Sequence, residues 1–158
     1  MVDIHESVSN LFQENEDSLE IFECKDEFSD TQSFCDHYGY KIEDSCNAIL
    51  IKSKKPEQFY ALFCVLGVDR LDVNHKGKAV LSSKKLSFAS REEAEEITGQ
   101  IYGGISPLGL PKDIKIYVDK SVMSRDKVFI GGGNRVSKFF LSPETLVDLT
   151  NASVEDLT

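Results

Sequence analysis

Ten residues in the second half of the chain, from Tyr102 to Pro111, read Tyr-Gly-Gly-Ile-Ser-Pro-Leu-Gly-Leu-Pro. They include three of the ten glycines and two of the four prolines of the 158-residue chain. Glycine permits positive φ angles and a close approach of backbone to a ligand, whereas proline fixes φ and stiffens the chain. The stretch therefore predicts a rigid loop rather than a helix or a central strand.

Such a loop can present backbone N–H groups, together with the hydroxyl of Ser106, to a ligand. These donors can hold a carbonyl oxygen or an anion without any charged side chain. A purely structural turn across the end of a sheet is the alternative interpretation of the same composition.

Short apolar runs separated by turn signals surround the loop and indicate that strands dominate the fold. The sequence Lys54-Lys55-Pro56-Glu57 joins two runs and predicts a hairpin. The triple glycine 131–133 predicts a second hairpin turn, or another backbone approach to the same ligand. Strands are expected at 19–24, 48–51, 60–66, 115–119, 127–130 and 138–141. Short helices are expected near 8–12, within 71–81, and after the N-caps Asp30, Ser90 and Ser142.

The composition is that of an ordinary globular domain, with 41% hydrophobic and 28% charged residues. The length suits one domain over residues 1–158, with residues 1–28 a less certain N-terminal extension. No apolar run approaches the ~20 residues that span a bilayer, and the first residues do not resemble a secretory signal. We therefore expect a cytoplasmic protein that has no membrane partner.

Charge is distributed unevenly around a formal net charge of −9. Residues 1–44 carry −11, residues 45–142 carry +6 and residues 143–158 carry −4. An acidic protein is a poor nonspecific binder of nucleic acid. The basic central block could still hold a few phosphates of one short RNA end, or its lysines could simply be solvated.

Familiar catalytic and metal motifs are missing from the sequence. The four cysteines form no Cys-x-x-Cys pair and the three histidines are scattered, so no metal site is predicted. Cys46 is the thiol nearest the candidate site, but no base is evident beside it. There is no Gly-x-Ser-x-Gly nucleophile motif. Asp69 and Asp72 flank Arg70 and predict a structural turn with an Arg–Asp pair, and the glutamates of 92–96 predict a solvated helix face.

Several segments together resemble the YbaK-like (YbaK/EbsC-like) family, which includes the editing domain of bacterial prolyl-tRNA synthetases and free-standing aminoacyl-tRNA deacylases. The matching segments, in order, are 47–52, 60–65, 67–72, 88–90, 92–99, the loop 103–111, 116–119, 128–134, 141–143 and 146–150. The resemblance covers roughly residues 30–157. It implies an α+β (mixed α/β) fold with a central mixed, mostly antiparallel curved sheet flanked by short helices.

The resemblance also implies a site. The catalytic residues would be Gly103, Gly104, Ile105 and Ser106 of the loop and Asn47. Pro107, Gly132, Gly133 and Asn134 would contact the substrate. Within the basic central block, and not from the resemblance, Lys52, Lys54 and Lys112 are the residues expected to contact the tRNA. Many family members carry lysine at the position of Asn47, and asparagine supplies no positive charge. Asn47 could orient a water or a carbonyl, or it could merely cap the strand.

The implied activity is hydrolysis, in trans, of the ester of a mischarged small amino acid (alanine, serine, threonine or cysteine), with tRNA for proline the family's commonest client. The expected partners are the aminoacyl-tRNA 3′ end and, as a further option, an aminoacyl-tRNA synthetase. No cofactor and no metal are expected. A noncatalytic module that binds tRNA or a nucleotide is the main alternative, and hydrolysis of a different small ester or amide is a third.

Overall fold

The computed structural model describes residues 2–158, and its helices are short and well capped. The Asp30 side chain accepts a 3.1 Å hydrogen bond from the Ser33 amide at the start of α2, and Gly39 ends this helix with a positive φ. A capping box between Ser90 and Glu93 begins α4. The predicted N-caps are therefore confirmed. The α-helices are α1 (Glu6–Glu14), α2 (Thr31–Tyr38), α3 (Lys78–Leu81), α4 (Arg91–Thr98) and α5 (Pro143–Thr150).

Tighter or wider helical turns join several of these elements. Three are 3₁₀ turns, at Asp26–Phe28, Ile42–Asp44 and Lys120–Ser124. A π-turn at Val73–Gly77 leads into α3, so the helix expected within 71–81 consists of two short pieces. None of the helices over residues 2–158 has the length and apolarity needed to cross a membrane.

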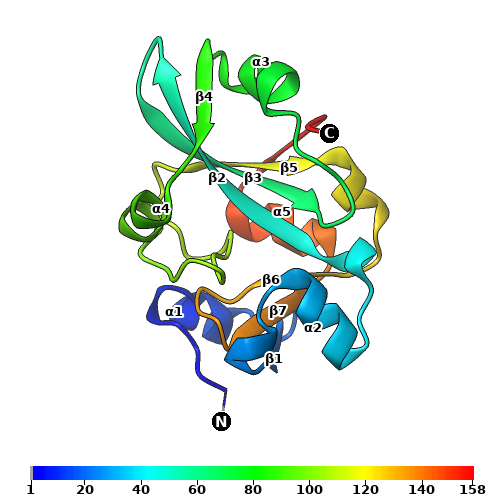
Figure 1. Cartoon of the computed structure of the whole chain (residues 1–158). Coiled ribbons are helices and arrows are strands. Elements are labelled where there is room, and N and C mark those ends of the chain that lie inside the picture. Colours follow the sequence, from blue (N-terminus) through cyan, green and yellow to red (C-terminus); the bar gives the residue numbers. More distant parts are fainter. Residues whose placement is uncertain (1) are drawn as a thin grey trace.

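The strands form two sheets (Figure 1). The larger has the order β4-β2-β3-β5-β8, and the smaller has the order β1-β7-β6. Strand β5 is parallel to β3 and to β8, whereas the other pairs are antiparallel. The strands are β1 (Glu20–Glu23), β2 (Cys46–Lys55), β3 (Phe59–Leu66), β4 (Lys85–Phe88), β5 (Lys115–Asp119), β6 (Val128–Gly131), β7 (Ser137–Leu141) and β8 (Ser153–Glu155). The mixed, mostly antiparallel α+β class is confirmed, with the strands divided between two sheets.

The principal hydrophobic core lies between the two sheets. Strand β3 is buried on both faces, because Leu62 and Cys64 face this core while Ala61 and Phe63 face a second cluster. This alternation follows from the period of two along a strand. Leu146 brings α5 into the principal core, which agrees with its position between the sheets in Figure 1. The core therefore holds β2 and β6, one from each sheet, at a fixed separation.

Candidate active site

A cavity of about 430 Å³ lies where the larger sheet, the smaller sheet and the glycine-rich loop meet. Its walls come from the segment before α2, the start of β2, the end of β4, the loop after α4, and strands β6 and β7. The lining residues are Ser29, Asp30, Thr31, Ser45, Cys46, Asn47, Ala48, Ile49, Leu50, Phe88, Ala89, Ala94, Tyr102, Gly103, Gly104, Ile105, Phe129, Ile130, Gly131, Arg135 and Lys138. The volume is in the range of small-ligand sites.

The glycine-rich loop is held from behind by the side chain of Gln100, which is 2% exposed. Its Nε2 donates to the Leu108 carbonyl at 2.8 Å and to the Ser7 hydroxyl at 3.1 Å. Its Oε1 accepts from the Ser106 amide at 2.7 Å. One buried amide thus ties the middle of the loop to the N-terminal helix. The sequence analysis missed this residue, because nothing in its local pattern distinguishes it from a solvated glutamine.

The loop also packs backbone against backbone on the β6–β7 hairpin. The Ile101 amide donates to the Gly133 carbonyl at 2.9 Å, and the Gly133 amide donates to the Gly104 carbonyl at 2.7 Å. A Cβ atom at Gly104 would overlap the Asn134 carbonyl oxygen. The triple glycine forms the predicted hairpin turn and is pressed against the loop.

Two of the four predicted loop amides are engaged within the protein. The Gly104 amide donates to the Ile101 carbonyl at 2.9 Å, and the Ser106 amide is the one bonded to Gln100. The amides of Gly103 and Ile105 have no hydrogen-bond acceptor among residues 2–158, and both residues line the cavity. At this cavity, the loop amides available to a ligand are therefore those of Gly103 and Ile105.

Several predicted contact residues lie outside the cavity. Ser106 is fully buried, and its hydroxyl accepts from the Leu108 amide. Asn134 is a structural residue that donates to the Asp3 carbonyl and accepts from the Val136 amide. Gly132 and Gly133 lie behind the loop, and Pro107 lines a separate hollow. From the turn region of the hairpin, Gly131 and Arg135 line the cavity instead.

Asn47 lines the cavity from β2, and its side chain is held by hydroxyls. Its Oδ1 accepts from Thr31 at 3.1 Å and from Ser45 at 3.0 Å. Its Nδ2 donates to no acceptor within residues 2–158. Both partners of Oδ1 are side-chain hydroxyls. The alternative interpretation, in which Asn47 caps the strand, would have required hydrogen bonds to nearby backbone. The observed bonds leave the amide N–H groups free for a water or a substrate oxygen.

The three lysines predicted to bind tRNA do not share this cavity. The Lys52 ammonium pairs with the Glu93 carboxylate at 2.9 Å, and the Tyr60 hydroxyl donates to the same carboxylate at 2.5 Å. The bonds from Tyr60 and Lys52 lower the Glu93 pKa to about 2. Lys54 is exposed at the end of β2, and Lys112 lines the hollow that contains Pro107.

Two cations that the sequence analysis did not select, Arg135 and Lys138, line the cavity instead. The Arg135 guanidinium lies over Gly103 and pairs with Asp26 at 2.9 Å. Lys138 is buried within the apolar strand β7. A signal existed for each, since Arg135 lies two residues after the triple glycine and Lys138 directly precedes the apolar run 139–141.

The cavity offers no nucleophile paired with a base among residues 2–158. None of the three histidines lines it. Cys46 lines it, but its thiol lies beside that of Cys64, and the hydrogen bond between them together with burial raises the Cys64 pKa. No group of three or more His, Cys, Asp or Glu side chains over the same residues could hold a metal ion.

Two aromatic side chains stand at the edge of the cavity. Phe88 is 62% exposed and Tyr102 is 48% exposed, although both line the cavity. Exposed aromatic rings are the surfaces on which unpaired nucleobases stack in single-stranded RNA recognition.

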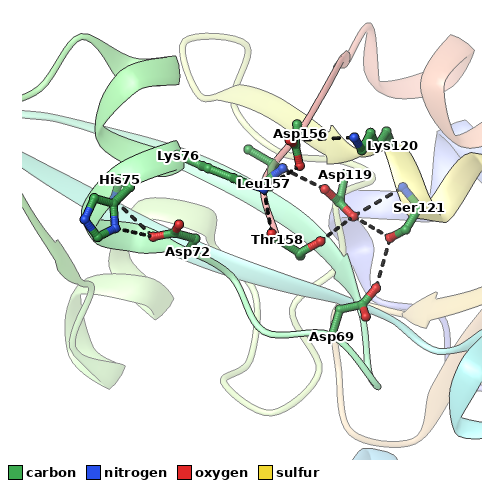
Figure 2. Close-up of polar contacts among 10 residues, drawn as sticks. All are labelled: Asp69, Asp72, His75, Lys76, Asp119, Lys120, Ser121, Asp156, Leu157 and Thr158. Atoms are coloured by element: carbon green, nitrogen blue, oxygen red, sulfur yellow. Dashed lines mark hydrogen bonds and ion pairs between the residues drawn. The ribbon is translucent and has the colours of Figure 1, made fainter.

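The acidic residues after β3 belong to a structural network away from the cavity (Figure 2). Asp69 accepts from the Ser121 hydroxyl at 3.0 Å, and Asp72 caps the π-turn through the His75 amide. Buried Asp119 accepts from the Leu157 amide at 2.7 Å and also from Ser121. The structural interpretation of this turn holds, but the expected Arg–Asp pair is wrong, because these carboxylates bind Ser121 and His75 instead of Arg70.

A sequence pattern described as "Aminoacyl-tRNA editing domain" matches residues 26–149. The chain belongs to this aminoacyl-tRNA editing domain family. The match spans both walls of the cavity, from the segment before α2 to β7, and thus confirms the YbaK-like resemblance.

Relatives of the editing domain occur alone and inside larger enzymes. An Enterococcus faecalis protein with the provisional name Cys-tRNA(Pro)/Cys-tRNA(Cys) deacylase is 29% identical over 58% of this chain and 56% of its own length. A proline–tRNA ligase of Treponema denticola is 34% identical over 82% of this chain and 22% of the enzyme. The chain therefore spans about half the length of the first relative and a fifth of the second.

The fold agrees with a solved structure across its full length. A crystal structure provisionally described as a trans-editing enzyme for prolyl tRNA synthetase superposes with a TM-score of 0.83 at 24% identity, covering 99% of both chains. At this identity the likeness shows a shared fold.

Proposed function

We propose that this editing domain is a deacylase that hydrolyses, in trans, the ester of a mischarged small amino acid on tRNA. The observation that carries the proposal is the pair of unbonded backbone amides, Gly103 and Ile105, at a cavity with no nucleophile–base pair. Two amide donors on one loop suit the carbonyl oxygen of an ester, which becomes negative as water adds to the carbonyl carbon.

The remaining walls suit the rest of an aminoacyl-tRNA end. Phe88 and Tyr102 offer aromatic faces to the terminal bases. Ala48, Ala89 and Ala94 give small apolar walls, which fit a small acyl side chain. Size alone discriminates small amino acids poorly, at ~1–3 kcal/mol per methylene, so a synthetase that makes such errors needs a second hydrolytic site.

In the proposed reaction water adds to the ester carbonyl carbon, the carbon–oxygen bond to the ribose breaks, and the ribose oxygen takes up a proton. The Gly103 and Ile105 amides hold the carbonyl oxygen, and the Nδ2 group of Asn47 orients the water or the carbonyl. The terminal ribose hydroxyl of the substrate would assist. Such a role in translation would place the protein in the cytoplasm, alone or docked to a synthetase.

The decisive experiment measures loss of the ester bond from a panel of aminoacyl-tRNAs: tRNA for proline charged with alanine, cysteine, serine, threonine or proline. Selective turnover of one mischarged species supports the proposal and names the substrate. Equal turnover of all species, including the correctly charged one, would contradict editing. Rapid hydrolysis of simple acyl esters without tRNA would favour a different small ester as substrate.

The second candidate is a noncatalytic module that binds the tRNA end. The observation in its favour is that the Asn47 side chain, which forms part of the cavity wall, is uncharged and is held by two hydroxyls. Binding of uncharged tRNA with no turnover of any charged species would select this alternative.

A further inference from the structure

Lys138 of β7 is a buried lysine with unused hydrogen-bonding capacity. It is 7% exposed, and its Nζ donates to the Ser29 carbonyl at 2.9 Å. The Phe34 ring lies on another side of Nζ, with its centroid at 4.9 Å. No carboxylate of residues 2–158 lies within ion-pair distance of Nζ. A lysine ammonium has three N–H groups, so two of them remain without an acceptor in the protein.

A buried ammonium without a counter-ion is unfavourable, and proteins usually pair such charges. Burial lowers the Lys138 pKa, while the nearby Cys24, Cys35 and Asp30 partly oppose this shift. Asp30 is the one carboxylate in the cavity lining, but it already caps α2 through the Ser33 amide. The fold therefore retains a costly positive charge that no protein group neutralises.

A second unused donor lies on the same wall. The Ser29 hydroxyl is buried and is the only buried side-chain polar atom among the described residues that lacks a hydrogen-bond partner. Ser29 and Lys138 both line the cavity. Unpaired buried polar groups are costly. An unpaired hydroxyl beside a lysine with spare N–H groups, both in the lining of one cavity, indicates a ligand atom that carries negative charge and lone pairs.

This wall adjoins Asn47. The three-residue segment 29–31 binds Lys138 through the Ser29 carbonyl and Asn47 through the Thr31 hydroxyl. The same segment therefore holds the charge of Lys138 and the neutral amide of Asn47. Both residues line the cavity together with Gly103 and Ile105.

We propose that Lys138 is a catalytic residue, whose ammonium, aided by the Ser29 hydroxyl, stabilises the negative charge that develops on the ester oxygens during hydrolysis. This inference rests on the proposed deacylase function. In the step, water adds to the carbonyl carbon, the ester bond breaks and the ribose oxygen takes the proton that water gives up. Lys138 keeps its three protons throughout and acts only through its charge and hydrogen bonds.

The test is single-turnover deacylation by Lys138→Met and Lys138→Gln, with enzyme concentration varied to separate the rate constant at saturation from the half-saturating concentration. Lys138→Gln preserves a donor for the Ser29 carbonyl without the charge, and so covers the case in which the methionine variant does not fold. Lys127→Met is the matched control, since Lys127 is an exposed lysine that pairs with Glu20 at the surface.

We expect both Lys138 variants to lose about 100-fold in the rate constant at saturation, as for loss of one oxyanion donor, while the half-saturating concentration stays close to that of wild type. Ser29→Ala should show a smaller loss of the same kind. An unchanged rate constant in a folded Lys138 variant would overturn the inference alone. A raised half-saturating concentration with an unchanged rate constant at saturation would also overturn it. That result would indicate that Lys138 binds a permanent anion such as a phosphate. Inactive wild type would overturn the function and this inference together.

Discussion

The Gly104 carbonyl accepts a 2.7 Å hydrogen bond from the Gly133 amide, so the loop and the hairpin touch through their main chains. A Cβ at position 104 has no space, because the Asn134 carbonyl occupies it. The shape of the loop, and with it the direction of the Gly103 and Ile105 amides, thus depends on a glycine that has an ordinary φ angle.

Gly104→Ala should therefore displace the loop and lower deacylation by about 100-fold, since a shift of about 1 Å can have that effect on a reacting geometry. The measurement is single-turnover hydrolysis of the preferred mischarged tRNA. Gly39→Ala is the control: its φ is +79° but its Cβ would meet nothing within 4 Å. It should lose about 1 kcal/mol of stability and no activity. Full activity in Gly104→Ala would disprove the assigned loop contact.

Gln100→Met should destabilise the protein by about 3 kcal/mol. The substitution keeps the length of the side chain but leaves the buried Ser106 amide and Leu108 carbonyl without their partners, at about 1–3 kcal/mol each. Urea unfolding at neutral pH measures the change. Gln32→Met removes an exposed side-chain bond to Asp36 and should alter stability by less than about 0.5 kcal/mol. Equal effects of the two substitutions would show that Gln100 does not hold the loop.

The Glu93 carboxylate should contribute to stability in a pH-dependent way. Its folded pKa, about 2, lies below the ordinary value of 4.5. The contribution is therefore complete above pH 4.5 and is lost as pH falls toward 2. The urea midpoints of wild type and Glu93→Gln should differ at pH 6, differ less at pH 3 and converge as pH falls to 2. Glu96→Gln, on the exposed face of the same helix, is the control, and its urea midpoint should stay close to that of wild type. A constant difference between wild type and Glu93→Gln would contradict the assignment.

Asp119→Ala should lose about 3 kcal/mol, because the buried carboxylate accepts from the Leu157 amide and from the hydroxyls of Ser121 and Thr158 (Figure 2). Asp119→Asn keeps one acceptor oxygen and should lose less. Hydrogen exchange at the Leu157 amide would report the effect directly, and protection that survives Asp119→Ala would refute it.

Much of the fold is encoded by local sequence patterns, and those parts could be predicted from the sequence alone. The β2–β3 hairpin, the capped starts of α2, α4 and α5, and the glycine end of α2 all follow from apolar periodicity and cap residues. Strands β4 and β8 were missed. β4 is a short edge strand with half of its residues exposed, and β8 pairs in parallel with a distant strand, so neither carries a local apolar signal.

The site was predicted only in outline. The loop and Asn47 do line one cavity, because a glycine pattern reveals where backbone can approach a ligand. Which amides remain free could not be predicted, since that depends on Gln100 and Ile101, which bond to the loop only in the folded chain. The cations that line the cavity were not selected, for a related reason. Counting surface lysines favoured Lys52, whose charge Glu93 neutralises, over Lys138, which lies inside an apolar strand.

The contacts of the first helix have a consequence for dissecting this protein. The family match begins at residue 26, yet Ser7 bonds to Gln100 and the Asp3 carbonyl accepts from Asn134, so residues ahead of the match support both glycine-rich segments from behind. Val8 adds a fully buried side chain to the principal core. A fragment cut where the family pattern starts would retain every residue that lines the cavity but lose the support that keeps the cavity in shape. The smallest fragment able to fold around this site is thus longer than the segment that identifies the family.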